Sequence, residues 1–344
     1  MINTTYYQDL TKMNTFGMKV KARCFMEYDS VADLVDIEFE ELARPVLHIG
    51  GGSNLLFTDD FKGTVLHSKI NFTEILEEGS DVLVSVGSGV VFDDFCAWAA
   101  KEGLWGVENL SYIPGEVGAS AVQNIGAYGV EVKDVIRRVY CYDTVEEEFV
   151  SFGVEECEYG YRDSIFKNPE VKGRYIVTHV VFALSRTPQP RLEYGHLKAA
   201  VESAGPELTP MLIRKVIIKI RKEKLPEPSV MGSAGSFFKN PVISAEHFAR
   251  IEAAAKAEHG PDYKVPHYDL PDGTVKVPAA WMIEQCGWKG RRSGGAAVYD
   301  KQPLVIVNYT GDAYPEEIIG LERRIIASVK AKFDIELHPE VDHI

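Results

Sequence analysis

Apolar residues in the first half of the chain recur in short runs separated by turn residues, a pattern that predicts β-strands. The clearest runs are residues 46–49, 63–66 and 82–86, followed by a second strand-rich stretch over 139–184. One helix is expected between them, because Phe95 and Trp98 lie at helical spacing and Gly103 follows as a stop. Asp93 or Asp94 is its expected N-cap.

Helical patterns dominate after the prolines at positions 188 and 190, which disfavour both helix and central strand. Apolar residues every three or four positions, each series preceded by a capping residue or proline, mark these helices. The expected helices run from Pro210 to Lys224 with Thr209 as cap, from Ser244 to about Gly260, from Pro278 to Gly287, and onward from Pro315. A strand-like segment follows at 335–337. Strands and helices do not alternate strictly, so the pattern predicts an α+β fold.

Composition narrows the class of protein. At 344 residues the chain exceeds one typical domain, so two or three domains are expected. The 37 Lys and Arg against 51 Asp and Glu give a net charge of −14, and long-range repulsion then argues against nucleic acid as a partner. Five scattered cysteines without a Cys-x-x-Cys pair predict reduced thiols and no metal site. The absence of a secretory leader and of an apolar run near ~20 residues predicts a cytoplasmic protein without a membrane partner.

Two glycine-rich segments offer bare backbone to a ligand. The first, Gly50-Gly51-Gly52-Ser53-Asn54, directly follows an expected strand, so its N–H groups can form a nest for a pyrophosphate; an ordinary tight turn is the alternative. The second, 113–129, holds four glycines and is too poor in large side chains to be core. Such a surface suits a flat ring or a nucleotide, with Gln123 and Asn124 available for its heteroatoms; a long irregular loop is the alternative.

Two standard nucleotide motifs are absent from the sequence. No P-loop pattern occurs, and Gly87-Ser88-Gly89 lacks the third glycine of a dinucleotide-binding turn because Phe92 takes its place. A dinucleotide would therefore have to be held in another way.

Three further segments carry candidate reactive side chains. Ser236 lies in 232–241, where glycines expose its hydroxyl beside aromatic residues, a lysine and an amide; a glycine-rich turn before a strand is the alternative. Arg162 offers a guanidinium that binds a carboxylate through two hydrogen bonds, or else a surface pair with Asp163. Glu340 belongs to the polar series 336, 338, 340 and 342, which shares one face of an extended strand and would ordinarily be solvated.

Together these segments resemble the UDP-N-acetylenolpyruvoylglucosamine reductase family, the MurB flavoenzymes of peptidoglycan precursor synthesis. The resemblance covers essentially the whole chain. The segments that carry it are GGGSN at 50–54, IPGEVGASAVQNIGAYG at 113–129, YGYRDSIFK at 159–167, GSAGSFFKNP at 232–241 and HPEV at 338–341. LEYGHL at 192–197 and residues 268–276 resemble the loop-bearing type I form of the family.

The resemblance implies a two-subdomain FAD-binding fold of the vanillyl-alcohol-oxidase/PCMH type and a C-terminal α+β substrate-binding domain. The implied parts are 1–70 and 71–207 for FAD, 208–335 for the substrate, and a C-terminal strand, 336–344, that returns to the active site. The residues expected to hold a noncovalent FAD are Gly50, Gly51, Gly52, Ser53, Asn54, Pro114, Gly115, Gly118, Ala119, Gln123, Asn124, Gly126, Ala127, Tyr128 and Gly129. Those expected to bind the nucleotide-sugar substrate are Tyr161, Tyr194, Lys224, Asn240, Tyr268, Lys276 and Gln302.

The family's reaction assigns roles to the reactive side chains. NADPH reduces the flavin, and hydride from flavin N5 then reduces the enolpyruvyl ether of UDP-N-acetylglucosamine to give UDP-N-acetylmuramate. Hydride addition to the terminal alkene carbon leaves negative charge on the neighbouring carbon as an enolate. Arg162 and Glu340 are expected to meet this charge, and Ser236 to deliver the proton. We expect the protein to act as a monomer.

Two alternatives stay open from the sequence. An FAD-dependent oxidase of the same fold could act on another substrate, although a covalent-flavin oxidase would be expected to offer a histidine or cysteine near the loops, and 111–130 contains neither. A noncatalytic module that binds a nucleotide sugar would explain the glycines and lysines. It would leave Ser236, Arg162 and Glu340 unexplained.

Overall fold

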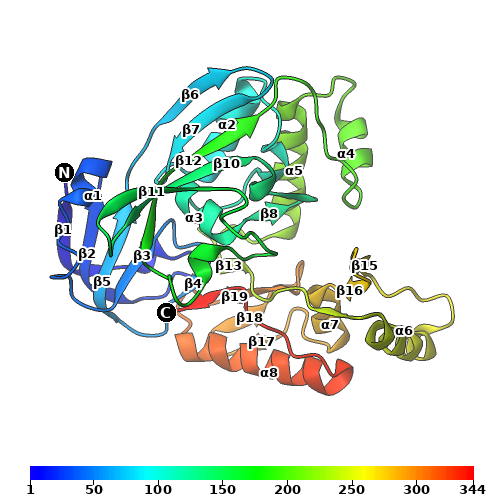
Figure 1. Cartoon of the computed structure of the whole chain (residues 1–344). Helices are drawn as coiled ribbons and strands as arrows, with labels where there is room; N and C mark the ends of the chain where they lie inside the picture. Colours follow the sequence, from blue (N-terminus) through cyan, green and yellow to red (C-terminus); the bar gives the residue numbers. More distant parts are fainter. The chain divides into compact units, whose positions relative to one another are not determined.

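The computed structural model describes residues 1–344, which divide into two compact units (Figure 1). Unit 1 comprises Met1–Leu10, Val20–Gly52 and Asp60–Glu223, and unit 2 comprises Thr11–Lys19, Ser53–Asp59 and Lys224–Ile344. Unit 2 therefore takes two short segments from the N-terminal part of the chain, and one of them begins directly after the third glycine of the 50–52 turn. The finer division expected at residues 70, 207 and 335 stays a prediction.

Unit 1 contains a four-stranded mixed sheet in the order β1-β2-β5-β3. Its strands are β1 (Asn3–Asp9), β2 (Lys21–Tyr28), β3 (Val46–Ile49) and β5 (Phe61–Ser68), with the short helix α1 (Val31–Val35) after β2. β5 runs parallel to both β2 and β3. Its residues 63–68 are all buried, as a central strand requires. The strands predicted at 46–49 and 63–66 are confirmed.

The second sheet of unit 1 is antiparallel, with the order β11-β10-β12-β7-β6. Its strands are β6 (Thr73–Glu78), β7 (Val82–Gly87), β10 (Ile136–Asp143), β11 (Glu148–Gly153) and β12 (Tyr175–Leu184). These bounds confirm the strand predicted at 82–86 and the strand-rich stretch at 139–184.

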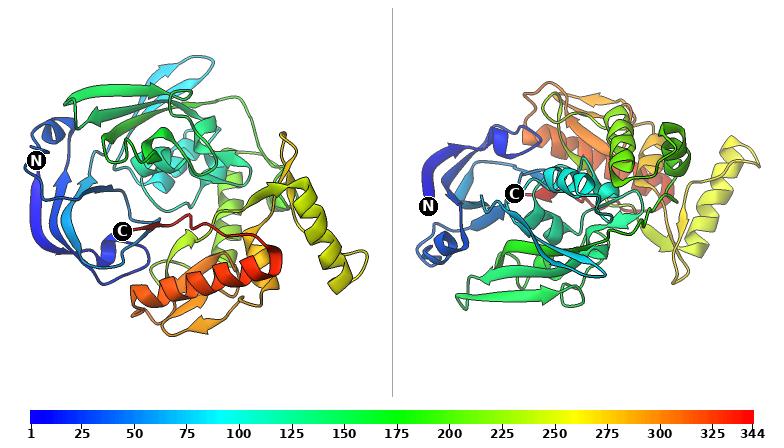
Figure 2. Two further views of the ribbon diagram at one scale, coloured as in Figure 1. Left: turned by 60° about the horizontal axis from the view of Figure 1, so that its bottom comes forward. Right: turned by 90° about the horizontal axis from the view of Figure 1, so that it is seen from above.

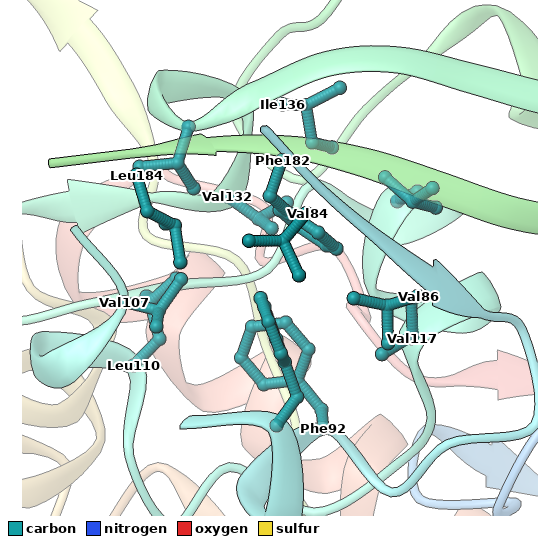
Figure 3. Packing of buried hydrophobic residues seen from close by; sticks show 14 of the residues in the cluster. Val84, Val86, Phe92, Val107, Leu110, Val117, Val132, Ile136, Phe182 and Leu184 are labelled. Atoms are coloured by element: carbon teal, nitrogen blue, oxygen red, sulfur yellow. The ribbon is translucent and has the colours of Figure 1, made fainter. Parts of the chain in front are cut away.

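Two helices, α2 (Phe92–Lys101) and α3 (Val117–Gln123), bury their apolar side chains against this second sheet. Figure 3 shows Phe92 from α2 pointing toward Val84, and Val117 from α3 beside Val86. The prediction that 113–129 is too small-sided for the core is therefore wrong for α3. Its small residues contribute by letting the helix approach the sheet closely, and Val117 is fully buried.

The start of α2 differs from the prediction. Its N-cap is Val91, without a side-chain cap, and Asp93 and Asp94 lie within the first turn. Asp93 instead forms an ion pair with Arg214 and accepts the backbone N–H of Tyr112 at 2.5 Å. The carboxylate therefore serves long-range contacts instead of capping its own helix.

Helices α4 (Leu197–Ala204) and α5 (Pro210–Lys224) follow the second sheet. They share an apolar cluster that includes Trp105, Leu197 and Ile217. Thr209 Oγ1 accepts the N–H of Leu212 at 3.1 Å, which confirms the predicted cap. Helix α4 was not among the predicted elements.

Unit 2 is built around an antiparallel sheet with the order β13-β19-β18-β17. The strands are β13 (Gly232–Ser236), β17 (Arg292–Ser293), β18 (Ala296–Val298) and β19 (Val305–Asn308). The long helix α8 (Pro315–Phe333) packs on β18 and β19 through its apolar stripe (Figure 2). This helix begins at the proline that predicted it.

Smaller elements complete unit 2. They are a sheet of β14 (Val242–Ser244), β16 (Thr274–Lys276) and β15 (Tyr268–Asp269), and the helices α6 (Ala245–His259) and α7 (Ala279–Gln285). Ser244 accepts the N–H of His247 and Gly260 ends α6, as predicted. No helix of the chain has both the length and the apolar character needed to cross a membrane. All five cysteines are free thiols, four of them buried.

The C-terminal segment forms its strand later than predicted. Residues 335–337 are not assigned to a strand, although Ile335 and Leu337 are buried and Glu336 is exposed, which matches the predicted alternation. The strand is β20 (Asp342–His343), which pairs in parallel with β4 (Leu55–Leu56). Before it, residues 338–340 make only an isolated antiparallel bridge with residues 237–239.

Candidate active site

The two glycine-rich segments expected to hold FAD are neighbours in unit 1. A Cβ atom at Gly50 would lie 3.0 Å from Ala119 Cβ, and one at Gly51 would lie 3.4 Å from Gly115 Cα. Any side chain at Gly50 would therefore press on α3. At Gly51 and Gly115 backbone without side chains faces backbone, which is the surface that a diphosphate or a flat ring requires.

Backbone strain is concentrated around the same segments. Tyr112, Asn124, Tyr128 and Arg162 all have positive φ angles, between 44° and 63°. Side chains other than glycine rarely adopt this region, and such residues are typical of ligand-binding sites, where the surrounding structure holds the strain. The observed strain therefore supports the assignment of 113–129 as ligand-binding backbone.

The side chain of Asn124 supports this backbone from inside. Its Nδ2 donates to Gly160 O at 2.8 Å and to Glu131 Oε2 at 3.1 Å, and its Oδ1 accepts the N–H of Lys133 at 3.2 Å. The residue is fully buried. The expectation that its amide is available to a ligand ring is therefore wrong, because these contacts occupy it. The neighbouring Gln123 Oε1 accepts a hydrogen bond from Lys167 Nζ at 2.9 Å.

Arg162 lies against the end of the cofactor segment. Its Nη2 donates to Gly126 O at 2.6 Å and its Nη1 donates to Asn124 O at 3.2 Å. Its guanidinium carbon lies 5.5 Å from the centre of the Tyr161 ring. The guanidinium is therefore held by backbone carbonyls of 113–129, which places its charge beside the candidate flavin site.

Tyr128 and Tyr194 lie side by side at the same end of the segment. Their rings meet edge to face, with centroids 5.9 Å apart. Tyr194, one of the residues expected to bind substrate, is 44% exposed. A Cβ at Gly129 would lie 3.6 Å from Tyr194 Cβ, so the tyrosine follows the turn closely.

A buried histidine between two carboxylates supports the glycine turn, and sequence reasoning missed it. His67 Nδ1 lies 3.0 Å from Glu27 Oε1, and Nε2 lies 2.9 Å from Glu116 Oε1. Burial alone would lower the pKa of His67, but the hydrogen bonds and charges of the two carboxylates raise it. A carboxylate only accepts, so these two contacts favour the protonated ring, in which both nitrogens donate. Glu116 is also the N-cap of α3, and its Oε2 lies 3.3 Å from a Cβ placed on Gly50.

Ser236 and Glu340 lie on neighbouring backbone segments of unit 2. Ser236 ends β13 after Gly235, whose φ is +70°. The next residue, Phe237, accepts the N–H of Glu340 through its carbonyl at 2.8 Å. The N–H of Lys239 donates to His338 O at 2.9 Å, so the two segments run together over several residues. Both side chains are half-buried.

Asn54 holds the Glu340 segment within unit 2. Its Nδ2 donates to Glu340 O at 3.0 Å, and its own carbonyl accepts the N–H of Asp342 at the same distance. The residue was predicted as a cofactor ligand. The contacts give it a second task, which is to hold the backbone of Glu340.

The remaining candidates for substrate binding are distributed over unit 2. Asn240 Oδ1 accepts the N–H of Ala279 at 2.9 Å and so caps α7 from a distant segment. Lys276 pairs with Tyr268 across β16 and β15, and Gln302 Oε1 accepts the N–H of Leu304 at 3.4 Å. Lys224 is exposed at the end of α5.

The predicted site residues thus fall into two groups. Unit 1 holds Gly50 to Gly52, the candidates between Pro114 and Gly129, Tyr161, Arg162 and Tyr194. Unit 2 holds Ser53, Asn54, Lys224, Ser236, Asn240, Tyr268, Lys276, Gln302 and Glu340. Their individual roles stay predictions.

Comparisons with known proteins identify the class of protein. Residues 23–149 match a family model described as FAD binding domain, and residues 227–344 match one described as UDP-N-acetylenolpyruvoylglucosamine reductase, C-terminal domain. The first match covers the glycine turn and the 113–129 segment, whose bare, strained backbone fits a dinucleotide. The chain is therefore an FAD-dependent oxidoreductase.

Relatives over the full length define the family. The UDP-N-acetylenolpyruvoylglucosamine reductase of Bacteroides fragilis is 51% identical over 97% of this chain and 98% of its own length. That of Porphyromonas gingivalis is 46% identical over 97% of both chains. The chain belongs to the UDP-N-acetylenolpyruvoylglucosamine reductase family, which confirms the resemblance. The crystal structure of the Thermus caldophilus enzyme shares its fold, with a TM-score of 0.68 at 22% identity over 100% of this chain and 98% of that chain. The predicted fold class is confirmed.

Proposed function

We propose that this protein reduces the enolpyruvyl ether of UDP-N-acetylglucosamine to UDP-N-acetylmuramate, a step in peptidoglycan precursor synthesis, with NADPH as the source of electrons. Relatives that carry the name of this reductase align with nearly the whole chain. The observation that supports the proposal most directly is the pairing of Ser236 and Glu340 on hydrogen-bonded neighbouring segments. A hydroxyl and a carboxyl are the groups that this reduction needs beside its electron donor.

The glycine turn at 50–52 and the segment 113–129 are the parts of the chain that would hold FAD. Their N–H groups suit its diphosphate, and their lack of side chains suits its rings. When bound, FAD supplies the hydride that this reduction adds to the terminal alkene carbon. The noncovalent character of the cofactor agrees with 111–130, which contains neither histidine nor cysteine.

The chain's own residues handle the charge and the proton. Addition of hydride leaves an electron pair on the neighbouring carbon, delocalised into the substrate carboxylate. Arg162 supplies a fixed positive charge and Glu340 a carboxyl group for this enolate. Ser236 then gives its hydroxyl proton to the carbon, which saturates the former double bond. The hydride and the proton together account for both hydrogens of the product.

The other predicted residues bind the nucleotide part of the substrate. Lys224 and Lys276 provide two cations for the two phosphates. Tyr161, Tyr194 and Tyr268 supply rings, and Asn240 and Gln302 supply amides. We assign a monomer in the cytoplasm to this activity, with the nucleotide sugar as its partner and without nucleic acid or membrane.

An anaerobic experiment tests the proposal. The purified protein is expected to be yellow, to bleach when NADPH is added, and to regain its colour when UDP-N-acetylglucosamine enolpyruvate follows. A reduced flavin that an unrelated acceptor reoxidises, but this substrate does not, would favour an oxidoreductase with another substrate. A protein that purifies without colour and takes up no FAD would favour the noncatalytic binding module.

A further inference from the structure

Helix α8 carries a carboxylate in an unusual position. Glu322 is only 6% exposed and lies on the buried side of the helix with Leu321 and Ile325. A buried carboxylate is costly unless it is paired. Its partner is His343, whose Nε2 lies 3.1 Å from Glu322 Oε2. The reaction proposed above uses neither residue, so the cost of this pair calls for another explanation.

The histidine belongs to the terminal strand that follows Glu340. His343 pairs with Leu56 in the two-residue ladder between β20 and β4. Its ring centroid lies 6.1 Å from that of Phe237, the residue that follows Ser236 and accepts the N–H of Glu340. His343 therefore contacts α8 on one side and the end of the Ser236 strand on the other. Figure 2 shows the C-terminal segment, in dark red, leaving α8.

The setting of the His343 ring favours its charged form. Glu322 raises the pKa of His343 above its ordinary value, and Asp342 adds to this, while Arg323 on the same helix opposes it. Glu322 and Arg323 from α8 and Asp342 from β20 are the charged groups that act on the ring. The contact is an ion pair at 3.1 Å, and Glu322 Oε2, which is buried, has no hydrogen-bond partner besides it.

We propose that the Glu322–His343 ion pair is a positioning device that fixes the segment carrying Glu340 against the strand carrying Ser236, so that the enolate formed in the reaction is protonated efficiently. The inference rests on the proposed function and extends it to two residues to which the reaction described above gives no role. Both side chains and both segments belong to unit 2.

The short strand explains why such a device is needed. A ladder of two residues stabilises little by itself. Glu340 precedes His343 by three residues, roughly 10 Å of extended chain, so an anchor at 343 limits the movement of the backbone at 340. A displacement of about 1 Å in a reacting group lowers a rate by about 100-fold. The pair is therefore placed where a small loss of order has a large effect on the proton-transfer step.

The test separates the two half-reactions in the full FAD-loaded protein. In His343→Asn and Glu322→Gln we expect reoxidation of reduced flavin by the substrate to slow by about 10- to 100-fold. Flavin reduction by NADPH and the KM for the substrate should stay within about twofold, because both sites are intact. The double variant should be no slower than either single variant, since both substitutions remove one pair. His259→Asn, which removes a histidine near Glu258 on the surface of the same unit, is the matched control and should behave as wild type.

A second variant distinguishes charge from packing. His343→Phe keeps a ring against Phe237 but removes the ion pair, and we expect it to be as slow as His343→Asn. A wild-type rate in His343→Phe, additive losses in the double variant, or equal losses in both half-reactions would overturn the inference. Circular dichroism and flavin content establish that each variant is folded. If the wild-type protein is not reoxidised by the substrate, the proposed function fails first; if it is, and the variants match it, only the positioning device fails.

Discussion

The two regions that carry the candidate site are stabilised in opposite ways. In unit 1, the turn at 50–52 and the segment 113–129 depend on the absence of side chains, because a Cβ added at Gly50, Gly118 or Gly126 would lie 3.0 Å or less from a neighbouring atom. In unit 2, the segments of Ser236 and Glu340 are joined by a few long-range backbone hydrogen bonds, and an ion pair between buried Glu322 and partly exposed His343 lies beside them. The first region should thus be sensitive to added volume and the second to the loss of a polar partner. Under the proposed function, the first region holds a cofactor throughout and the second must align a proton donor once per turnover, so the two regions have different structural needs.

The largest effect is expected where the second region does chemistry. Ser236→Ala should slow substrate-driven reoxidation by about 10³-fold, within the range of a general acid, and leave reduction by NADPH near normal. Stopped-flow absorbance of the flavin measures both steps. Ser233→Ala, on the same strand and buried, is the control and should leave both rates within about twofold. Equal losses in both steps for Ser236→Ala would mean that the hydroxyl is structural.

Features that depend on residues close together in the chain could be predicted from the sequence. Ser244 with Gly260 marked both ends of α6, and the run 46–49 gave the bounds of β3, because caps and short apolar runs act within a few residues. The helix α3 was missed, since its small residues hide the helical period. Contacts between residues far apart in the chain could not be predicted, because they leave no pattern in the sequence. His67 meets carboxylates 40 and 49 residues away, and only the folded sheet brings them together.

In the first region, His67 lies between two carboxylates, and its removal tests how much this contact stabilises the region. His67→Gln should lower the free energy of unfolding at neutral pH by roughly 3 kcal/mol, because two partly buried carboxylates lose the buried ring between them. The pKa of His67 is raised in the folded protein, so its contribution is complete below pH 6.5 and is lost as the pH rises through the raised value. The difference between wild type and variant should thus shrink in alkaline solution.

His48, on the neighbouring strand, is the contrasting case. Burial lowers its pKa to about 4, so the folded protein holds it neutral. Its contribution is present above pH 6.5 and is lost as the pH falls from there toward about 4. His48→Gln should therefore differ most from wild type at neutral pH and approach it in acid. Urea unfolding at several pH values gives the stability difference between wild type and each variant as a function of pH. If the two differences followed the same pH dependence, the surroundings of His67 and His48 would not set the charge of their rings.

Substitution of one helical glycine in each region tests how well each region tolerates an added side chain. A Cβ at Gly118 in α3 would lie 2.8 Å from Ser88 Cβ, closer than packed atoms allow, whereas a Cβ at Gly320 in α8 meets nothing within 4 Å. Gly118→Ala should cost about 2 kcal/mol of stability and weaken retention of FAD. Gly320→Ala should instead stabilise the protein by about 0.5–1 kcal/mol, through helix propensity. Thermal unfolding and equilibrium dialysis of FAD measure the two effects, and a gain in both variants would contradict the close packing of α3.

The smallest effect is expected at the cap of α5. Thr209→Ala removes the hydrogen bond to the N–H of Leu212 and should cost about 1 kcal/mol, whereas Thr209→Asn keeps an acceptor and should cost much less. Because α5 carries Arg214 and so holds Asp93 and the start of the 113–129 segment, any loss beyond the cap should appear as weaker FAD retention and not as slower protonation. A change in the reoxidation rate of Thr209→Ala at full flavin occupancy would show that the two regions are coupled, and would remove the distinction between them.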